Sequence, residues 1–128
     1  MWKEFLPEQC PPQSAEALEA EVYRILKSPT PTEDDFVPYS RLHEQNTRYN
    51  NLCSSYAISF FNSISSAEKA LESSIIRGKA LGTHIGLFHL KRHHGVSQQN
   101  SSTGHINTWL YKAWSFSDFE YSKIIEQK

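Results

Sequence analysis

The 128-residue sequence has little cysteine and no long hydrophobic run. Cys10 and Cys53 are its only cysteines, and two isolated cysteines make neither a disulfide framework nor a C-x-x-C zinc site. We therefore expect two buried or inert thiols, both reduced. No apolar segment approaches the roughly 20 residues that cross a bilayer, and the start MWKEFLPEQCPP lacks the basic and apolar regions of a signal peptide. These absences predict a soluble, cytoplasmic protein that does not enter a membrane.

Motifs that name a reaction are also missing. The sequence has no HExxH helix, no phosphate-binding GxxxxGK[ST] or GxGxxG loop, and no GxSxG nucleophile turn. Phosphoesterases that use two H-x-[ST] triplets are excluded, because the residues two positions after His84 and His105 are glycine and asparagine. No carboxylate accompanies these histidines to complete a catalytic zinc site. We predict neither a metal nor another resident cofactor.

Acidic residues are absent from residues 73–117, whereas residues 1–44 carry nine of them. The net charge of −1 therefore hides a gradient along the chain. Such a gradient either lets one half of the fold neutralise the other or marks a surface for a small anionic ligand or a protein partner. The pI of about 6.6 lacks the basic footprint of a nucleic-acid-binding domain. Basic and histidine residues of this stretch are Arg77, Lys79, His84, His89, Lys91, Arg92, His93, His94, His105 and Lys112.

The residues that are present are sufficient for one globular domain. A chain of 128 residues with 12% aromatic side chains can bury a sizeable core without staples. We predict a single domain over residues 1–128 of the α+β class. It has a curved, mainly antiparallel sheet, one principal packed helix at about residues 66–76, and an irregular N-terminal arm over residues 1–13.

The clearest structural signals lie between Tyr56 and Leu90. The first six residues are almost continuously apolar, which is typical of a strand buried on both faces. Ser65 and Glu68 match a capping box, and apolar positions then recur at helical spacing up to Gly78, a common residue just after a helix. The alternating residues that follow favour a strand. This segment predicts a strand, a helix and a second strand.

The remaining patterns are weaker. Residues 21–27 fit both a helical stripe and a strand, and their β-branched and aromatic content favours a strand. The polar stretch 39–54 is aperiodic, so it is either functional or partly helical. Residues 91–104 indicate a mobile loop that joins the strand ending at Leu90 to an antiparallel return strand at 105–113. One more strand is predicted within residues 116–125.

The hairpin over residues 84–111 is the candidate binding surface. Gly82 and Gly86 fall on one face of its first strand, and glycine within a strand marks either strong curvature or the close approach of a ligand. Cationic, imidazole and indole side chains on the same hairpin suit a small anionic ligand or a protein partner. The sequence thus predicts a non-catalytic binding or regulatory module that uses His84, Lys91, Arg92, His105 and Trp109.

Two short stretches, residues 22–26 and 56–71, resemble the start of an ADP-ribosyltransferase fold. Arg24 lies on one expected strand, and Ser59 lies on the next, followed by the helix after SISSAEKAL. The resemblance implies that Arg24 holds NAD together with Ser59 or Tyr56, and that Glu120 stabilises a ribosyl cation. The family's Glu-x-Glu or Gln-x-Glu pair is missing, because Asp118 precedes Glu120 by two positions. An NAD-using transferase or a degenerate relative is the alternative function; otherwise the chain has the character of a small bacterial protein.

Overall fold

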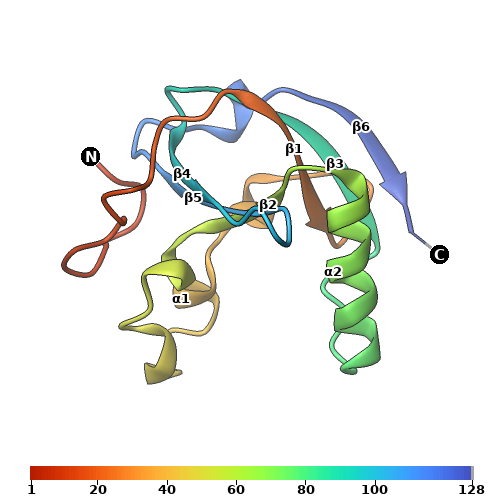
Figure 1. Cartoon of the computed structure of the whole chain (residues 1–128), viewed down its shortest axis with the longest axis horizontal. Helices are drawn as coiled ribbons and strands as arrows, with labels where there is room; N and C mark the ends of the chain where they lie inside the picture. The colour runs from red at the N-terminus through yellow and green to blue at the C-terminus, as the bar shows by residue number, and fades with distance from the viewer. Residues whose placement is uncertain (128) are drawn as a thin grey trace.

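The computed structural model describes residues 1–127, apart from the side chains at positions 48, 118, 122 and 123. Within this range six strands form one antiparallel sheet of order β4-β5-β2-β1-β3-β6 (Figure 1). This confirms the predicted α+β class and antiparallel sheet. The strands are β1 (Ala20–Leu26), β2 (Ile58–Phe61), β3 (His84–Leu90), β4 (Gly95–Gln99), β5 (His105–Leu110) and β6 (Tyr121–Glu126).

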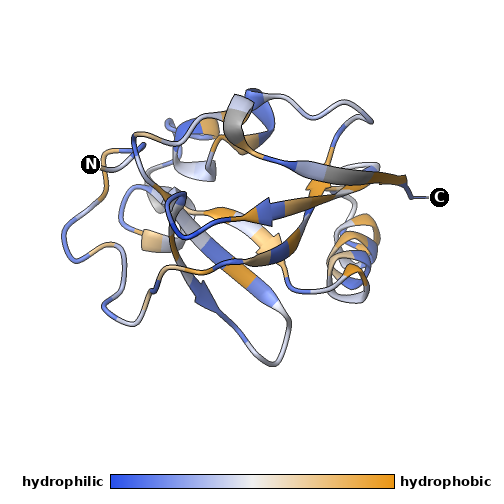
Figure 2. Ribbon diagram, turned by 90° about the horizontal axis from the view of Figure 1, so that it is seen from above, coloured by the Kyte–Doolittle hydropathy of each residue, from blue (hydrophilic) through white to orange (hydrophobic). Residues whose placement is uncertain are grey.

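Two hydrophobic cores lie on opposite faces of this sheet, because alternate residues of a strand point to opposite sides. On β1, Val22 and Leu26 join the larger core, whereas Tyr23 and Ile25 pack against the smaller one. Hydrophobic colour accordingly concentrates on the strands in the middle of the molecule (Figure 2). The larger core consists of Val22, Leu26, Phe36, Ile58, Phe60, Phe88, Leu90, Ile106, Leu110, Trp114 and Phe119.

The principal helix, α2 (Ile64–Ile76), covers the smaller core. Ala67 is fully buried there against Phe61 and Ile85. The helix begins two residues before the predicted start, because Ser63 rather than Ser65 is its N-cap and accepts a hydrogen bond from the Ser66 amide. The predicted apolar stripe is correct for Ala67 and Leu71, whereas Ile75 is 55% exposed and Ser74 is buried in its place. The cap moves because an earlier serine in NSISS is better placed.

One predicted connection is wrong. The strand at residues 84–90 does not pair with the strand at 105–110; β3 lies between β1 and β6, and β5 lies between β2 and β4. The stretch expected as a loop contains β4, which pairs with β5 through Val96 opposite Trp109. An edge strand has a full strand partner on one side only, and the outer side of β4 is paired through the isolated bridge of Glu16 with Ser97. Such a strand needs little apolar alternation, and the sequence GVSQQ carries little.

Short helices occupy the polar segment between β1 and β2. They are η1 (Glu33–Phe36), α1 (Tyr39–Leu42), η2 (Thr47–Tyr49) and η3 (Cys53–Tyr56), and η4 (Phe116–Asp118) precedes β6. The Thr32 amide donates to the Asp35 carboxylate at 2.7 Å, which fixes the start of η1. Figure 1 shows α1 and α2 extending to the same side of the sheet. Residues 39–54, for which the sequence left a functional or a partly helical segment open, are therefore partly helical.

The two cysteines are not inert thiols, as the sequence led us to expect. Cys10 and Cys53 form a disulfide with a Cα–Cα distance of 5.5 Å. This bond ties the N-terminal arm to η3. Pairing across 43 residues depends on the fold bringing both Cα atoms within bridging distance, and spacing along the chain does not reveal that.

Gly82, just before β3, and Gly86, within it, allow the chain segments to approach one another. A side chain at Gly82 would meet the Leu26 carbonyl, and one at Gly86 would meet the side chains of Leu26, Phe88 and Ile124. The close approach predicted at these positions is therefore made by the chain itself.

No helix within residues 1–127 is both long and apolar enough to span a bilayer.

Candidate functional site

Arg24 joins three separate segments of the fold. It lies on β1, and its Nε and Nη2 both donate to the Asp35 carbonyl, at 3.0 and 2.6 Å. Nη1 donates to the Ser59 carbonyl at 2.7 Å. The register of β1 and β2 pairs Tyr23 with Phe61 only, so the guanidinium takes up a carbonyl that the ladder leaves open. Arg24 thereby holds β1, η1 and β2 together where β1 and β2 separate.

The positive charge of Arg24 is stabilised by the dipoles of backbone carbonyl groups rather than by a salt bridge. Burial lowers the pKa of Arg24 to about 10, while Asp35 and Tyr39 act in the opposite direction to a smaller extent. The group therefore stays cationic at neutral pH. Among the side chains that the structure describes, the ion pairs are those of Glu4 with Lys3 and Arg41, and Arg24 has none. Its guanidinium also lies 5.3 Å from the centre of the Phe36 ring.

Ser59 and His105 meet on the neighbouring strand pair. The register places Phe61 opposite His105 and Ser59 opposite Asn107, so these four side chains share the face that α2 covers in part. Ser59 Oγ lies 2.9 Å from His105 Nε2, within hydrogen-bond distance. Both residues are half-buried. Burial lowers the pKa of His105, so a neutral imidazole beside a hydroxyl is the form at neutral pH.

Stability should fall as the pH drops through the titration range of His105. In the unfolded chain His105 has its ordinary pKa of 6.5, and in the folded protein that pKa is lower. The unfolded state therefore binds more protons below about pH 6.5, and the free energy of unfolding decreases with falling pH. Urea unfolding of the wild type and of His105→Asn at pH 7.5 and 5.5 tests this. The wild type should lose more stability than the variant, since the other histidines are common to both; equal losses would contradict it.

A Ser–His pair supplies two members of a catalytic triad, the nucleophile and its base. A third group must orient the base. Among the described side chains, no carboxylate hydrogen-bonds to His105. No group of three or more His, Cys, Asp or Glu residues within those side chains is arranged to hold a metal ion. The pair is thus equipped to donate and accept hydrogen bonds with a ligand.

Three rings form an aromatic cluster near this site. The rings of Tyr39, the first residue of α1, and His43, which follows its last residue, lie 5.8 Å apart, and the ring of Tyr49 on η2 lies 6.0 and 5.6 Å from them. Tyr39 is 45% exposed and close enough to Arg24 to favour its charge. The cluster belongs to the polar stretch that the sequence left without a role, and its signal is the i, i+4 spacing of Tyr39 and His43.

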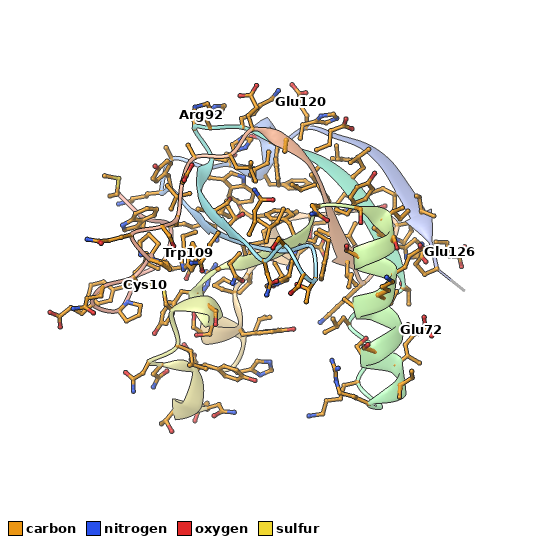
Figure 3. All side chains as sticks on the ribbon, viewed as in Figure 1. Cys10, Glu72, Arg92, Trp109, Glu120 and Glu126 are labelled. Atoms are coloured by element: carbon orange, nitrogen blue, oxygen red, sulfur yellow. A yellow bond between two sulfur atoms is a disulfide. The ribbon has the colours of Figure 1, made fainter. Side chains whose placement is uncertain are left out.

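Glu120 lies away from this site. It immediately precedes β6, and its carbonyl accepts a hydrogen bond from the His89 amide at the far end of β3. Two strands, β1 and β3, separate β6 from the strand that carries Ser59. Figure 3 shows Glu120 beside the end of the sheet where Arg92 lies, opposite the end of α2 marked by Glu72. Arg24 and Ser59 are brought together, and Glu120 does not join them.

Tyr56, the substitute for Ser59 in the resemblance, ends η3. Its hydroxyl donates to the Asn50 carbonyl at 2.9 Å, which stabilises the turn before η3. This bond directs the phenol toward its own segment.

The five residues of the predicted hairpin surface are scattered. His84 begins β3 and contacts Thr83 Oγ1 at 2.8 Å, whereas Lys91 and Arg92 follow the end of the same strand, about 20 Å further along. Two strands, β2 and β1, lie between His105 on β5 and β3. Trp109 is only 1% exposed, and its indole donates to the Cys53 carbonyl at 3.0 Å. Of the five, His105 is the one that reaches the Arg24–Ser59 site.

No family model, curated protein or solved structure matches this chain.

Proposed function

We propose that this chain is a non-catalytic binding module for a small anionic ligand, with its site at the side chains of Ser59 and His105 and the charge of Arg24 behind Ser59. The observation that carries the proposal is the contact of Ser59 Oγ with His105 Nε2, together with the hydrogen bond from the Arg24 guanidinium to the backbone carbonyl of the same Ser59. The Arg24 guanidinium makes this bond from the face of the larger core, where it lies over the Phe36 ring. These strands are neighbours, so the three residues are held on rigid elements. The site is narrower than the 84–111 surface expected from the sequence.

The chemistry of the site favours an anion. A guanidinium has five N–H groups, and the three hydrogen bonds of Arg24 use three of them. The buried guanidinium keeps a positive charge without a carboxylate partner among the described side chains, and this charge favours an anion near Ser59. Ser59 and His105 present the hydroxyl and the imidazole that would bond to a ligand oxygen, on the face that α2 covers in part.

NAD is the first organic anion to consider, because the ADP-ribosyltransferase resemblance implied that an arginine and a serine on successive strands hold it. The Arg24 guanidinium bonds to the backbone carbonyl of Ser59, so the two residues are in contact, whereas the Ser59 hydroxyl lies on the opposite face of the sheet beside His105. The position of Glu120 gives no support to a transfer step, since reacting groups must reach one substrate. Binding of NAD without transfer, as in a degenerate relative, is the form of the alternative that the geometry favours.

The test is calorimetric titration with inorganic pyrophosphate and with NAD. At least one probe should bind saturably to the wild type. Ser59→Ala and His105→Asn should each weaken binding about tenfold or more, since hydrogen bonds to charged groups contribute about 1.5–3 kcal/mol. The matched control is Lys91→Ala/Arg92→Ala, which removes two cations from the remote turn and should bind like the wild type.

The possible results of this titration distinguish the proposed site from the 84–111 hairpin surface. If the Lys91/Arg92 variant loses binding and the other two keep it, the hairpin surface is correct and the site proposed above is wrong. If neither probe binds, the anion proposal fails. Hydrolysis of NAD by the wild type, abolished in Glu120→Gln, would instead favour the transferase.

The cytoplasmic location expected from the sequence rested in part on free thiols, beside the lack of a signal-peptide pattern and of a membrane-spanning run. The Cys10–Cys53 disulfide supports an oxidising compartment instead, because such bonds persist mainly outside the reducing cytosol.

A further inference from the structure

The disulfide connects the N-terminal arm to the segment that leads into the candidate site. Cys53 is the first residue of η3, and β2 with Ser59 follows directly after η3. Cys10 belongs to the irregular arm. Figure 3 shows Cys10 near Trp109, whose indole bonds to the Cys53 carbonyl. The bond therefore couples the position of the arm to the segment that precedes the site.

The arm is anchored independently on β5. The Lys3 amide donates to the Leu110 carbonyl at 2.9 Å, and the Trp2 ring stacks on Tyr111 at 5.0 Å. Glu16, three residues after the arm, forms a further bridge with Ser97 of β4. One end of the disulfide is thus fixed to the sheet through several contacts.

The segment at the other end combines short-range hydrogen bonds with contacts to the arm and β5. Ser55 Oγ is within 2.6 Å of the carbonyls of Tyr49 and Leu52, and Tyr56 bonds to Asn50. Tyr56 also lines a small cavity together with Lys3 and Leu110, and the Trp109 indole bonds to the Cys53 carbonyl. The disulfide adds the covalent link between this segment and the arm. Tyr49 of the aromatic cluster and Ser59 of the site flank this segment.

We propose that the Cys10–Cys53 bond is a redox clamp on the ligand site, an inference that rests on the proposed function. With the bond formed, residues 49–56 hold Ser59 and the aromatic cluster in the binding arrangement. A dithiol reductant opens it: a thiolate attacks one sulfur to give a mixed disulfide, and its second thiol then releases the other cysteine. Two electrons and two protons convert the bond to two thiols, and the reductant becomes a disulfide.

The environment of the bond permits this exchange. Cys10 and Cys53 are both half-buried rather than enclosed, so a reductant reaches the sulfurs. Phe5, between the β5 anchor and Cys10, is 96% exposed, so little apolar packing holds that part of the arm once the bond is open. Binding is then low in a reducing cytosol and high in an oxidising compartment.

The experiment measures pyrophosphate and NAD binding to the full chain, oxidised and then reduced with an excess of dithiothreitol. The affinity should fall tenfold or more on reduction and recover on reoxidation. Cys10→Ser/Cys53→Ser should show the weak affinity of the reduced protein and no response to reductant. A reduced sample rebridged by a one-carbon thioether, which no reductant cleaves, should bind tightly with and without dithiothreitol.

The thioether sample keeps the proposal testable if the double-serine variant does not fold. Equal affinity of the oxidised and reduced protein, or tighter binding after reduction, overturns the clamp and leaves the binding function intact. Failure of the oxidised protein to bind either probe is a failure of the proposed function. Circular dichroism of the reduced protein must remain that of a folded chain, because loss of binding through global unfolding would also overturn a local clamp.

Discussion

Replacing Phe36 by alanine should lower the free energy of unfolding by about 3–5 kcal/mol, the cost typical of removing a buried phenylalanine. Phe36 lies on η1 and is fully buried in the larger core. Its ring centroid lies between 5.3 and 6.3 Å from those of five other rings, so one deletion removes five aromatic contacts. These rings belong to Phe60, Phe88, Trp114, Phe116 and Phe119.

The Phe36 variant should also affect the candidate site. Arg24 lies over the Phe36 ring and donates to the carbonyl of Asp35, the preceding residue. A cavity at position 36 therefore loosens the segment that accepts two of the three Arg24 hydrogen bonds.

Guanidinium unfolding followed by circular dichroism measures the loss of stability. Phe5→Ala is the matched control, since the same atoms are removed from a side chain that is 96% exposed, and its effect should stay within about 0.5 kcal/mol. A loss below about 1 kcal/mol for Phe36→Ala would show that the aromatic core does not depend on η1.

The elements that could be predicted from the sequence are those whose signals are local. The strand at β1 follows from β-branched and aromatic content, and α2 follows from helical spacing of apolar residues and from Gly78 at its end. β4 was missed because an edge strand depends on a partner far along the chain rather than on its own composition. The pairing of β3 with β1 and β6 is likewise a property of the whole sheet.

The site residues likewise divide into those that local sequence patterns predict and those whose positions depend on the pairing of the strands. The proximity of Arg24 to Ser59 was implied by a resemblance, and the addition of His105 depends on β5 lying beside β2, a pairing that no local pattern encodes. Trp109 was expected at a surface because its strand alternates, yet its face is covered by η3 through the Cys53 carbonyl. Glu120 is near the C-terminus in sequence, but its position is set by β6 joining the far side of β3.

Removing the disulfide should lower the free energy of unfolding by about 4 kcal/mol. In the chain-entropy account, a cross-link reduces the freedom of the unfolded chain, and the effect is about 3 kcal/mol for a 15-residue loop and about 4.7 for a 100-residue loop. Cys10 and Cys53 are 43 residues apart, so their bond falls between these values. For a domain of 128 residues this corresponds to a melting temperature lower by about 10–20 °C.

Thermal unfolding of Cys10→Ala/Cys53→Ala against the oxidised wild type measures this effect, with the reduced wild type as a second sample. The reduced protein and the variant should melt together, because both lose the same cross-link. Either single alanine variant should match the double variant under reducing conditions, since one cysteine cannot form the bond. If removing the bond costs less than about 1 kcal/mol, the segment from η1 to η3 must already be restrained in the unfolded chain. The arm and η3 would then be joined without relying on the covalent link, and the reason to expect an effect of reduction on the Ser59 site would disappear with it.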